Sequence, residues 1–587
     1  MNIHLKPNLP LWHRGMRCGS QVSVVVKGKL VVALTLSIAL AVTTLGIQVT
    51  ARKAPQLSPG AQILPAPAGL APVSSSLVFS TYIGGSQEDL IRDITTDASG
   101  NIYITGGTAS PDFPTTPGAF QNTHGGWMDV FVAKLNPNGQ LLWSTRIGGP
   151  DYDRAYGLEV DNQGYVYVAG RAGPGFPTTA NAFQPTYQGY YTGNAYGDQN
   201  AFVCKLMPDG ASLVFCSYIG PWQLARDIDI DGSGAIYVAG SHNAARQTSI
   251  PPAAWFANAF QKTSRGASDL VVAKIATNGS RVEWATYLGG SGNDGSGPTI
   301  RVKHDDGTVY VLQQTQSTDL PVTASAYQTT NGGGWDFSLA RFTASGSALI
   351  FSTYLGGSGS EFLETHEMAL DDLGNAYVSG WTSSPDFPIT AGALQSDLRG
   401  QYDIPLAKIS ANGSQLLTST YLGGNATDGV EGIQIDAQGN VNIFGTTRSS
   451  DFQVTADAFQ SQLGGAGDFF VAKLTPDLHR ILYASYLGGV GDDFGRAGWV
   501  DQTGRLITGG STGSDDWPLL HPIQNTRGGL GDGALAKIAL SPSVPTSTPD
   551  PTPIRQYLPM LMVESTQVAR DGTRSASPQW QQKLGGG

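Results

Sequence analysis

Short runs of β-branched and apolar residues recur along most of this chain, separated by turn residues. Within the stretch 91–147, Ile91–Asp97 and Asn101–Thr108 are joined by Ala-Ser-Gly, and Asp129–Leu135 and Leu141–Ile147 are joined by Asn-Pro-Asn-Gly. Runs of this length around such turns predict β-hairpins. They are too short and too evenly spaced for βαβ units, and no segment shows sustained helical periodicity. One unit of the chain is therefore predicted to contain four antiparallel strands.

A six-residue phrase of the STYLGG type closes each unit and recurs seven times at intervals of 64 to 72 residues. A repeat of this kind indicates one supersecondary unit used many times. Seven units of four short strands predict an all-β fold, a seven-bladed β-propeller. The copies of the phrase are Ser80–Gly85, Ser144–Gly149, Cys216–Pro221, Ala285–Gly290, Ser352–Gly357, Ser419–Gly424 and Ala484–Gly489.

The two ends of the repeat region complement each other. The seventh unit ends with Gly531–Leu540 and has no fourth strand of its own, whereas Leu77–Ile83 is a fourth strand that precedes any first strand. Pairing of these two segments would remove two open sheet edges. We therefore expect Leu77–Ile83 to lie antiparallel beside Ala534–Leu540 and to close the ring.

Charged residues repeat at fixed positions in the units. The turn of the first hairpin opens with Asp97, Asp161, Asp231, Asp371, Asp436 and Asp501, with His304 in the fourth unit. The third strand carries Lys134, Lys205, Lys274, Arg341, Lys408, Lys473 and Lys537. We interpret the aspartates as turn-forming residues that accept their own backbone N–H groups, and the cations as partners of a carboxylate at the blade edge. The alternative is a sevenfold charged ring that contacts a ligand.

These phrases resemble a known family. STYLGG, the D-x-x-G-N-x-Y-V turn, D-F-P-x-T and D-x-F-V-A-K-L are similar to the SBBP repeat, a bacterial seven-bladed β-propeller repeat, over about Leu77–Leu540. The resemblance implies a propeller on an exported, surface-associated protein. It implies no reaction, because the family has no established catalytic residues.

The segments outside the repeats differ in composition. Residues 1–51 combine a basic start with the uncharged run Leu30–Ala51, which is typical of a signal peptide or of an uncleaved N-terminal membrane anchor. Either interpretation places the rest outside the cytoplasm, in the cell envelope or secreted. Residues 52–76 form a Pro/Ala-rich spacer, residues 77–540 the propeller, residues 541–556 a Pro/Thr/Ser linker, and residues 557–587 a short apolar segment with a polar tail that we expect to be disordered.

The charge balance limits the partners. The formal net charge is −11, and loss of residues 1–51, with five Lys/Arg and no acid, would take it to −16. Such acidity argues against nucleic acid and against an anionic membrane as partners. The membrane is then reached only through the N-terminal segment, if that segment is uncleaved. We expect a monomeric propeller.

Catalytic and metal-binding patterns are missing from the sequence. The six histidines downstream of residue 51 fall in different units, and no two have metal-ligand spacing. We therefore predict no catalytic residue and no cofactor. Acidic residues follow several of the Gly-Gly turns and are interpreted as solvated loop acids, with calcium binding as the alternative. They are Glu88, Asp89, Asp151, Asp153, Asp294, Glu361, Asp428, Asp492 and Asp493.

Two of the three cysteines occupy facing strands. Cys204 and Cys216 lie in the third and fourth strands of the second unit, either side of a turn, where other units place Ala and Ser. Opposed cysteines on antiparallel strands in an exported protein can form a disulfide. The alternative is two free buried thiols.

The second and third units break the repeat with aromatic residues. The long loop of the second unit is Pro185–Asn200, and the third unit replaces D-F-P by Ile250–Phe256. Aromatic side chains on loops suit recognition of sugars or protein surfaces. A ligand patch is therefore predicted at Tyr187, Tyr190, Tyr191, Tyr196, Trp222 and Trp255, unless these rings pack on their own blades.

The function predicted from these features is an exported binding or structural scaffold for a surface protein or a polysaccharide. The alternative is a hydrolase or lyase with its site at the central channel of the propeller. An enzyme would require off-pattern His, Asp, Glu or Arg residues that converge on one face. The sequence gives no sign of such a concentration, so binding is favoured over catalysis.

Overall fold

The computed structural model describes residues 75–189, 196–247 and 249–540, and all of them belong to one unit. Residues 1–74 and 541–587, which contain the predicted signal, linker and tail and the predicted spacer up to residue 74, lie outside the described residues, as do Tyr190 and Tyr191. No helix of the described residues is long and apolar enough to cross a membrane.

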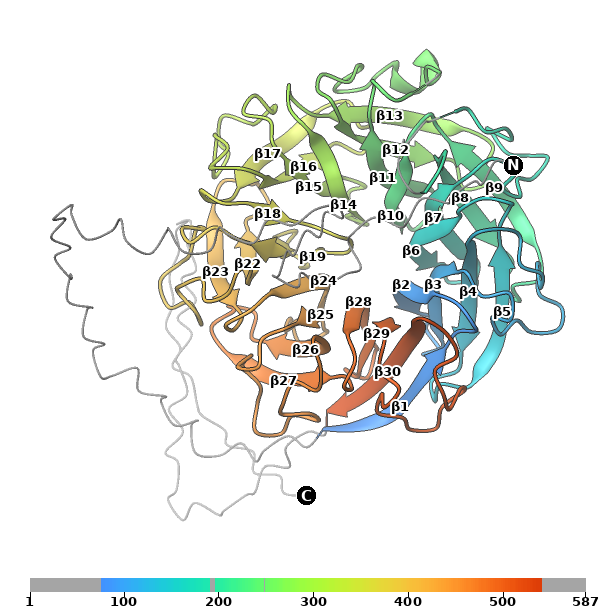
Figure 1. Cartoon of the computed structure of the whole chain (residues 1–587). Helices are drawn as coiled ribbons and strands as arrows, with labels where there is room; N and C mark the ends of the chain where they lie inside the picture. Colours follow the sequence, from blue (N-terminus) through green and yellow to red (C-terminus); the bar gives the residue numbers. More distant parts are fainter. Residues whose placement is uncertain (1–74, 190–195, 248, 541–587) are drawn as a thin grey trace, which may run out of the picture. The chain divides into compact units, whose positions relative to one another are not determined.

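Seven four-stranded antiparallel sheets form the propeller predicted from the repeats (Figure 1). Blade 1 contains β2 (Asp89–Thr96), β3 (Ile102–Thr108), β4 (Asp129–Leu135) and β5 (Leu141–Ile147). Blade 2 contains β6 (Arg154–Val160), β7 (Val166–Ala172), β8 (Asn200–Leu206) and β9 (Leu213–Ile219). Blade 3 contains β10 (Leu224–Ile230), β11 (Ile236–His242), β12 (Asp269–Ile275) and β13 (Val282–Leu288), with the 3-10 helix η2 (Ala253–Phe256).

The remaining blades follow the same order, with one irregularity. Blade 4 contains β14 (Asp294–Val302), β15 (Val309–Thr315), β16 (Asp336–Phe342) and β17 (Leu349–Leu355). Blade 5 contains β19 (Met368–Leu370), β20 (Ala376–Val378), β22 (Ile404–Ile409) and β23 (Leu416–Leu422), and a separate pair of β18 (Glu361–Phe362) with β21 (Trp381–Thr382). Blade 6 contains β24 (Asp428–Ile435), β25 (Val441–Thr447), β26 (Asp468–Leu474) and β27 (Ile481–Leu487).

Blade 7 combines the two ends of the repeat region. It contains β28 (Asp493–Val500), β29 (Leu506–Thr512), β30 (Asp532–Leu540) and β1 (Ser75–Ile83), in the spatial order β1-β30-β29-β28. Strand β1 begins two residues earlier than predicted, and its register joins Leu77 to Ile538 and Ile83 to Gly533. The predicted ring closure is confirmed, and Figure 1 shows β1 and β30 side by side at the start and end of the colour scale.

The core lies between neighbouring blades. The cluster that joins blades 1 and 2 includes Val130 and Ile147 from one sheet and Leu158 and Val168 from the next. Similar clusters join the later blades. Because the second and third strands of a blade are covered on both faces, they read as continuous apolar runs such as Val130–Ala133 rather than as alternating ones.

The repeated charges belong to the scaffold, as predicted. The third-strand cation lies 2.5 to 3.6 Å from the aspartate of the first turn in every blade, with Asp306 taking that place in blade 4, where His304 breaks the pattern. The aspartates also accept backbone N–H groups of their own turns, for example Ser99 N–H to Asp97 at 2.9 Å. This pairing supports the scaffold interpretation over the alternative of a sevenfold charged ring that contacts a ligand.

Candidate functional site

The first strand of each blade lies innermost in the ring (Figure 1) and brings different side chains to the propeller axis. Five residues before each turn position, the seven blades do not share one residue type but carry an off-pattern set, most of it charged or aromatic. This set is Arg92, Tyr156, Arg226, Thr299, His366, Glu431 and Arg496. Side chains from distant blades meet there, so the axis is the candidate site.

A carboxylate of blade 5 reaches the arginines of blades 1 and 3. Glu364 Oε2 lies 2.5 Å from the Arg226 guanidinium and 3.4 Å from that of Arg92. Arg226 Nε also donates to the backbone carbonyl of Glu364 at 2.7 Å. A second pair follows from neighbouring blades, because Arg496 lies 2.6 Å from Glu431. The contact of Arg92 with Glu364 thus joins residues 272 positions apart across the axis.

Two further arginines of blade 2 have no carboxylate partner among the described residues. The Arg154 guanidinium donates to the hydroxyl of Tyr156, and that of Arg171 lies 4.1 Å from the ring centre of Tyr196 and 5.2 Å from that of Tyr152. The Arg171 residue is only 4% exposed, and its Nε has no hydrogen-bond partner. A buried guanidinium normally lies beside a carboxylate or another hydrogen-bond acceptor. These two arginines therefore have unused capacity to bind an anion.

The surrounding charges shift the pKa values of this group. Burial raises the pKa of Glu364, but Arg226, Arg92, Arg496 and Arg154 outweigh this effect and bring it to about 2. Burial likewise raises the pKa of the Tyr156 phenol, and the arginines around it outweigh burial and lower it to about 7. Burial and the neighbouring guanidiniums together lower the pKa of Arg92 to about 10. The neighbouring guanidiniums contribute to all three shifts, and for Arg92 burial is the larger cause.

The next layer of side chains along the axis is centred on a histidine. His366 Nδ1 lies 3.2 Å from Asp227 and Nε2 lies 3.4 Å from Asp93, and both aspartates are buried. Burial lowers the pKa of His366, but Asp93 and Asp227 outweigh it and raise the value to about 9. Asp227 also pairs with Arg301 at 2.8 Å. The imidazolium is held between two carboxylates and is not free to act as a general base.

The same aspartates tie neighbouring first strands together. Asp93 of blade 1 accepts the backbone N–H of Leu158 in blade 2 at 2.7 Å, and Asp227 of blade 3 accepts that of Ile300 in blade 4 at 2.9 Å. First strands have a free edge toward the axis, so their N–H groups need partners of this kind. This layer has a structural role.

Blade 5 supplies both Glu364 and His366 through an irregular segment between β18 and β19. His366 has a φ of 63°, a left-handed conformation that is uncommon outside glycine. Its carbonyl accepts the N–H of Ile433 in blade 6 at 3.1 Å, and Gln314 of blade 4 donates to the carbonyl of Leu363 at 2.7 Å. The break in the first strand of blade 5 is what lets this segment reach the axis.

The described aromatic residues of the predicted ligand patch, Tyr187, Tyr196, Trp222 and Trp255, do not form one surface. Trp222 is 1% exposed and packs 5.9 Å from Trp255, which also contacts Phe183, so the prediction of an exposed Trp222 is wrong. Its indole fills the apolar cluster between blades 2 and 3. Tyr187 packs against Tyr218 at 6.0 Å. Of the described members of the patch, only Tyr196 reaches the arginines at the axis.

The acids after the Gly-Gly turns are not solvated, contrary to prediction, in most blades. Asp89 is buried and accepts the Gly85 N–H and the Ser110 hydroxyl, both at 2.7 Å. The carboxylates of these acids accept hydrogen bonds from backbone N–H groups of the turn and from the next loop, so they connect the two. Asp153, Asp294, Glu361, Asp428 and Asp493 are buried in the same way. Within the described residues, no group of three or more His, Cys, Asp or Glu side chains could hold a metal ion.

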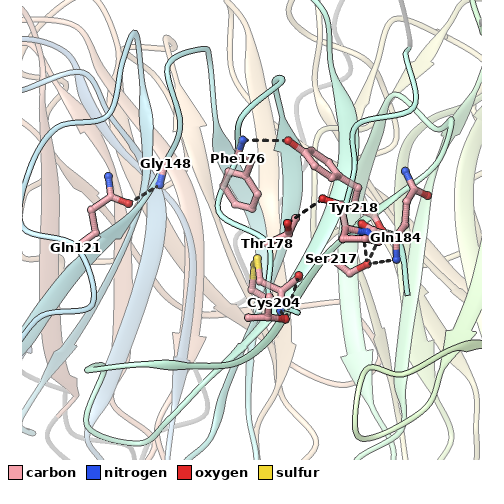
Figure 2. The surroundings of a disulfide bond; sticks show 11 residues. Gln121, Gly148, Phe176, Thr178, Gln184, Cys204, Ser217 and Tyr218 are labelled. Carbon is pink, nitrogen blue, oxygen red and sulfur yellow. Dashed lines mark hydrogen bonds between the residues drawn. A yellow bond between two sulfur atoms is a disulfide. The ribbon is translucent and has the colours of Figure 1, made fainter. Parts of the chain in front are cut away.

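The structure joins Cys204 and Cys216 by a disulfide (Figure 2). The two residues are direct partners in the β8–β9 register. Figure 2 also shows the hydrogen bonds that surround this strand pair, from Phe176 N–H to the Tyr218 hydroxyl and from Gln184 N–H to Ser217.

We expect the disulfide to be present in the purified protein. The denatured, unreduced full-length chain should expose one reactive thiol, that of Cys18, and three after reduction, because Cys204 and Cys216 are bonded to each other. Thiol titration with and without a reductant measures this. Three reactive thiols before reduction would show that the bridge does not form.

Sequence reasoning missed the axis group, although a signal was present. The repeats were compared at the positions that they share, and the informative position is the one where they differ. In the ARDID and IRDIT runs of blades 3 and 1, Arg226 and Arg92 look like ordinary polar residues of an exposed strand face. An alignment of the seven first strands shows that this position varies between repeats, and the first strand of each blade lies innermost.

Comparison with known proteins agrees with the repeat. The family model described as a β-propeller repeat, SBBP, matches residues 78–114, 142–176 and 350–388. A search of curated proteins finds no match. Among solved structures, hydrazine synthase of Kuenenia stuttgartiensis is similar at 11% identity and a TM-score of 0.39, over 72% of this chain and 93% of that one. The quinohemoprotein alcohol dehydrogenase of Comamonas testosteroni is similar at 9% identity and a TM-score of 0.40, over 82% and 78%. We draw nothing about function from similarities at this level.

Proposed function

From the premise that this chain is a seven-bladed propeller of the SBBP repeat family, we propose that it is an exported binding module that captures an anionic group of its partner at the propeller axis. The partner is a polysaccharide or a surface protein that carries carboxylate, sulfate or phosphate groups. One observation carries the proposal: the buried Arg171 guanidinium has no carboxylate beside it in the described part of the chain.

The charge of the site supports an anion. Five guanidiniums gather here, and only three of them, those of Arg92, Arg226 and Arg496, pair with the carboxylates of Glu364 and Glu431. Arg154 and Arg171 are the other two. The chain as a whole has a formal net charge of −11, so this excess of cations is local. Arginine presents a planar fork of donors that matches carboxylate, sulfate and phosphate groups. Glu364 already makes this kind of carboxylate–guanidinium contact with two of the arginines within the chain.

The hydrogen-bond and charge partners of the titratable groups favour binding over a hydrolase or lyase reaction. Tyr156, the phenol with a pKa lowered to about 7, is fully buried, and its hydroxyl accepts from Arg154. His366 is held between two carboxylates. Both groups are already engaged by partners within the chain, so neither is placed to act on a substrate as a base or a nucleophile, and geometry comes before pKa in such an assignment.

Export remains part of the proposal. The basic and apolar start of the sequence supports it, and so does the Cys204–Cys216 disulfide, because disulfides persist in oxidising compartments. An acidic propeller outside the cytoplasm is suited to a cell-surface partner and not to nucleic acid.

Replacement of Arg171 tests the proposal. We expect Arg171→Gln to weaken binding of a polyanion at least about tenfold, since a charge-assisted contact of this kind is lost. The probes are polygalacturonate, dextran sulfate and poly-L-glutamate, with neutral dextran as the uncharged reference, measured by isothermal titration calorimetry at two salt concentrations. Binding should weaken as salt rises.

Arg281→Gln is the matched control, because it removes one positive charge from a side chain that is 65% exposed in the β12–β13 turn. Its affinities should equal those of the unchanged protein. If none of the three polyanions binds, or if both variants bind equally well, anion capture at the axis is wrong. Release of shortened chains from a probe would favour the lyase or hydrolase alternative instead.

A further inference from the structure

We propose that the anionic partner is an acidic polysaccharide, and that the exposed Trp127 and the half-buried Tyr196, supported by the buried Tyr152 between them, form an aromatic platform on which its sugar rings pack while its acidic groups reach Arg171 and Arg154. This inference rests on the proposed function and adds the class of ligand. It also assigns a binding role to a residue, Trp127, that lies outside the repeat pattern.

The platform is a continuous row of rings that ends at the arginines. Trp127 meets Tyr152 edge to face, with 5.4 Å between ring centres, and Tyr152 lies 4.9 Å from Tyr196. The Tyr196 ring then lies 4.1 Å from the Arg171 guanidinium and 5.9 Å from that of Arg154. The row therefore leads from an exposed loop of blade 1 to the cation-rich side of the axis.

Trp127 is exposed but fixed in place. It is 46% exposed, and it is the only aromatic residue among the large apolar side chains exposed in the described residues. Its backbone N–H donates to the carbonyl of Asp151 at 3.2 Å, and Met128 and Tyr152 form a β-bridge. The loop of blade 1 is thus held by blade 2, so the indole is presented on a rigid support.

The repeat does not require an aromatic residue at this position. Two residues before the repeated Asp or Asn (Asp129 in blade 1, Asp403 in blade 5), other blades carry small, polar or aliphatic residues: Asp198, Ala267, Gly334, Gln401, Ala466 and Leu530. A single exposed apolar side chain is common on a folded protein. The repeat does not call for a ring at this position, so Trp127 is available as a ligand contact.

The combination of flat rings and guanidiniums distinguishes a polysaccharide from an acidic protein. Sugar rings have apolar C–H faces that pack on aromatic rings, and an acidic polysaccharide places an anion at regular intervals beside those faces. An acidic peptide satisfies the arginines equally well but has no flat face for Trp127. Stacking next to Arg171 and Arg154 thus matches both features of an acidic sugar chain, whether its anion is a carboxylate or a sulfate.

Replacement of Trp127 tests the ligand class. In titrations of the full-length protein, Trp127→Ala should lower the affinity for polygalacturonate or dextran sulfate about tenfold, because the stacking contact with one large ring is lost. Whichever of the two polymers binds identifies the anion as carboxylate or sulfate. The affinity for poly-L-glutamate should not change. Trp127→Phe should retain most of the sugar affinity, and the unfolding temperature should be unchanged in both variants.

Leu530→Ala is the matched control, since Leu530 occupies the equivalent position of blade 7 and is 83% exposed. It should leave all affinities unchanged. If poly-L-glutamate binds in an Arg171-dependent way and neither acidic polysaccharide does, the ligand class is wrong and anion capture stands. If the polysaccharides bind equally to the Trp127→Ala protein, the platform is wrong. If no polyanion binds, the proposed function fails together with this inference.

Discussion

Deletion of residues 1–83 should abolish cooperative folding of the propeller, whereas deletion of residues 1–74 should leave it intact. The two truncations differ only in β1, which supplies the fourth strand of blade 7. Phe79, Tyr82 and Ile83 are fully buried in that strand, and burial of such side chains contributes about 1.5–3 kcal/mol each. Their loss is comparable with the whole stability of about 5–15 kcal/mol that is typical of a folded domain.

The strand also joins blade 7 to its own long loop. The Tyr82 hydroxyl donates to the carbonyl of Ser514 at 2.8 Å, and the Trp517 indole donates to the Ser80 hydroxyl at 2.8 Å. Without β1, the edge of β30 is open and can pair with another chain. We therefore expect aggregates or dimers of the longer deletion in size-exclusion chromatography and a broad, low thermal transition by circular dichroism.

A synthetic peptide that spans Ser75–Ile83 provides the complementary measurement. Added to the longer deletion, it should restore a monomeric species and raise the unfolding temperature, because it can occupy the vacant edge in the same register. A peptide of the same composition in scrambled order is the control. If the longer deletion unfolds at the same temperature as the shorter one, ring closure does not stabilise this protein.

Features that every blade repeats could be predicted from the sequence. The blade count, the pairing of β1 with β30 and the ion pairs between the first turn and the third strand all follow from comparison of equivalent positions. Each such position has the same surroundings in all seven blades, so one physical explanation accounts for all seven copies. The same comparison failed for Asp89 and its equivalents, because their burial depends on Ser110 and the loop that follows, which fold back over the turn.

The candidate site could not be predicted in this way, because no single blade contains it. Glu364 meets Arg226 and Arg92 only after blades 5, 3 and 1 have been placed around one axis.

Trp222 illustrates the opposite error, a predicted site residue that is buried. It stands where the other blades have a polar turn, and an exposed ligand contact was inferred, but Trp255, Phe256 and Tyr287 give it an apolar cluster to fill. Exposure of a loop residue depends on such contacts and not on its place in the repeat.

Replacement of His366 should cause the largest loss of stability of any single substitution at the axis. His366→Asn retains a residue that tolerates the observed φ of 63°, so the backbone is not the cause of the change. It removes the cation between Asp93 and Asp227, both buried. Removal of one partner of a buried charge pair typically costs about 3–5 kcal/mol, and we expect a loss of that order in urea unfolding near neutral pH.

The pH dependence identifies the imidazolium as the cause. The pKa of His366 is raised to about 9 in the folded chain, against about 6.5 for an unperturbed histidine. Stability contributed by this group is fully present below the lower value and is lost as the pH rises through the higher one. The difference in unfolding free energy between the unchanged protein and His366→Asn should therefore narrow by about 3 kcal/mol over that interval.

The charges that face the imidazole determine the sign of this effect. Asp93 from β2 and Asp227 from β10 raise its pKa, and the positive charge of Arg301 from β14 opposes them. His479→Asn is the control, because the His479 side chain is 40% exposed and lies 3.7 Å from Asp477 at the surface. Its stability should follow that of the unchanged protein at every pH. A constant difference between the unchanged protein and His366→Asn across the interval would show that His366 is held as a neutral side chain, and the charged layer at the axis would then have to be reassigned.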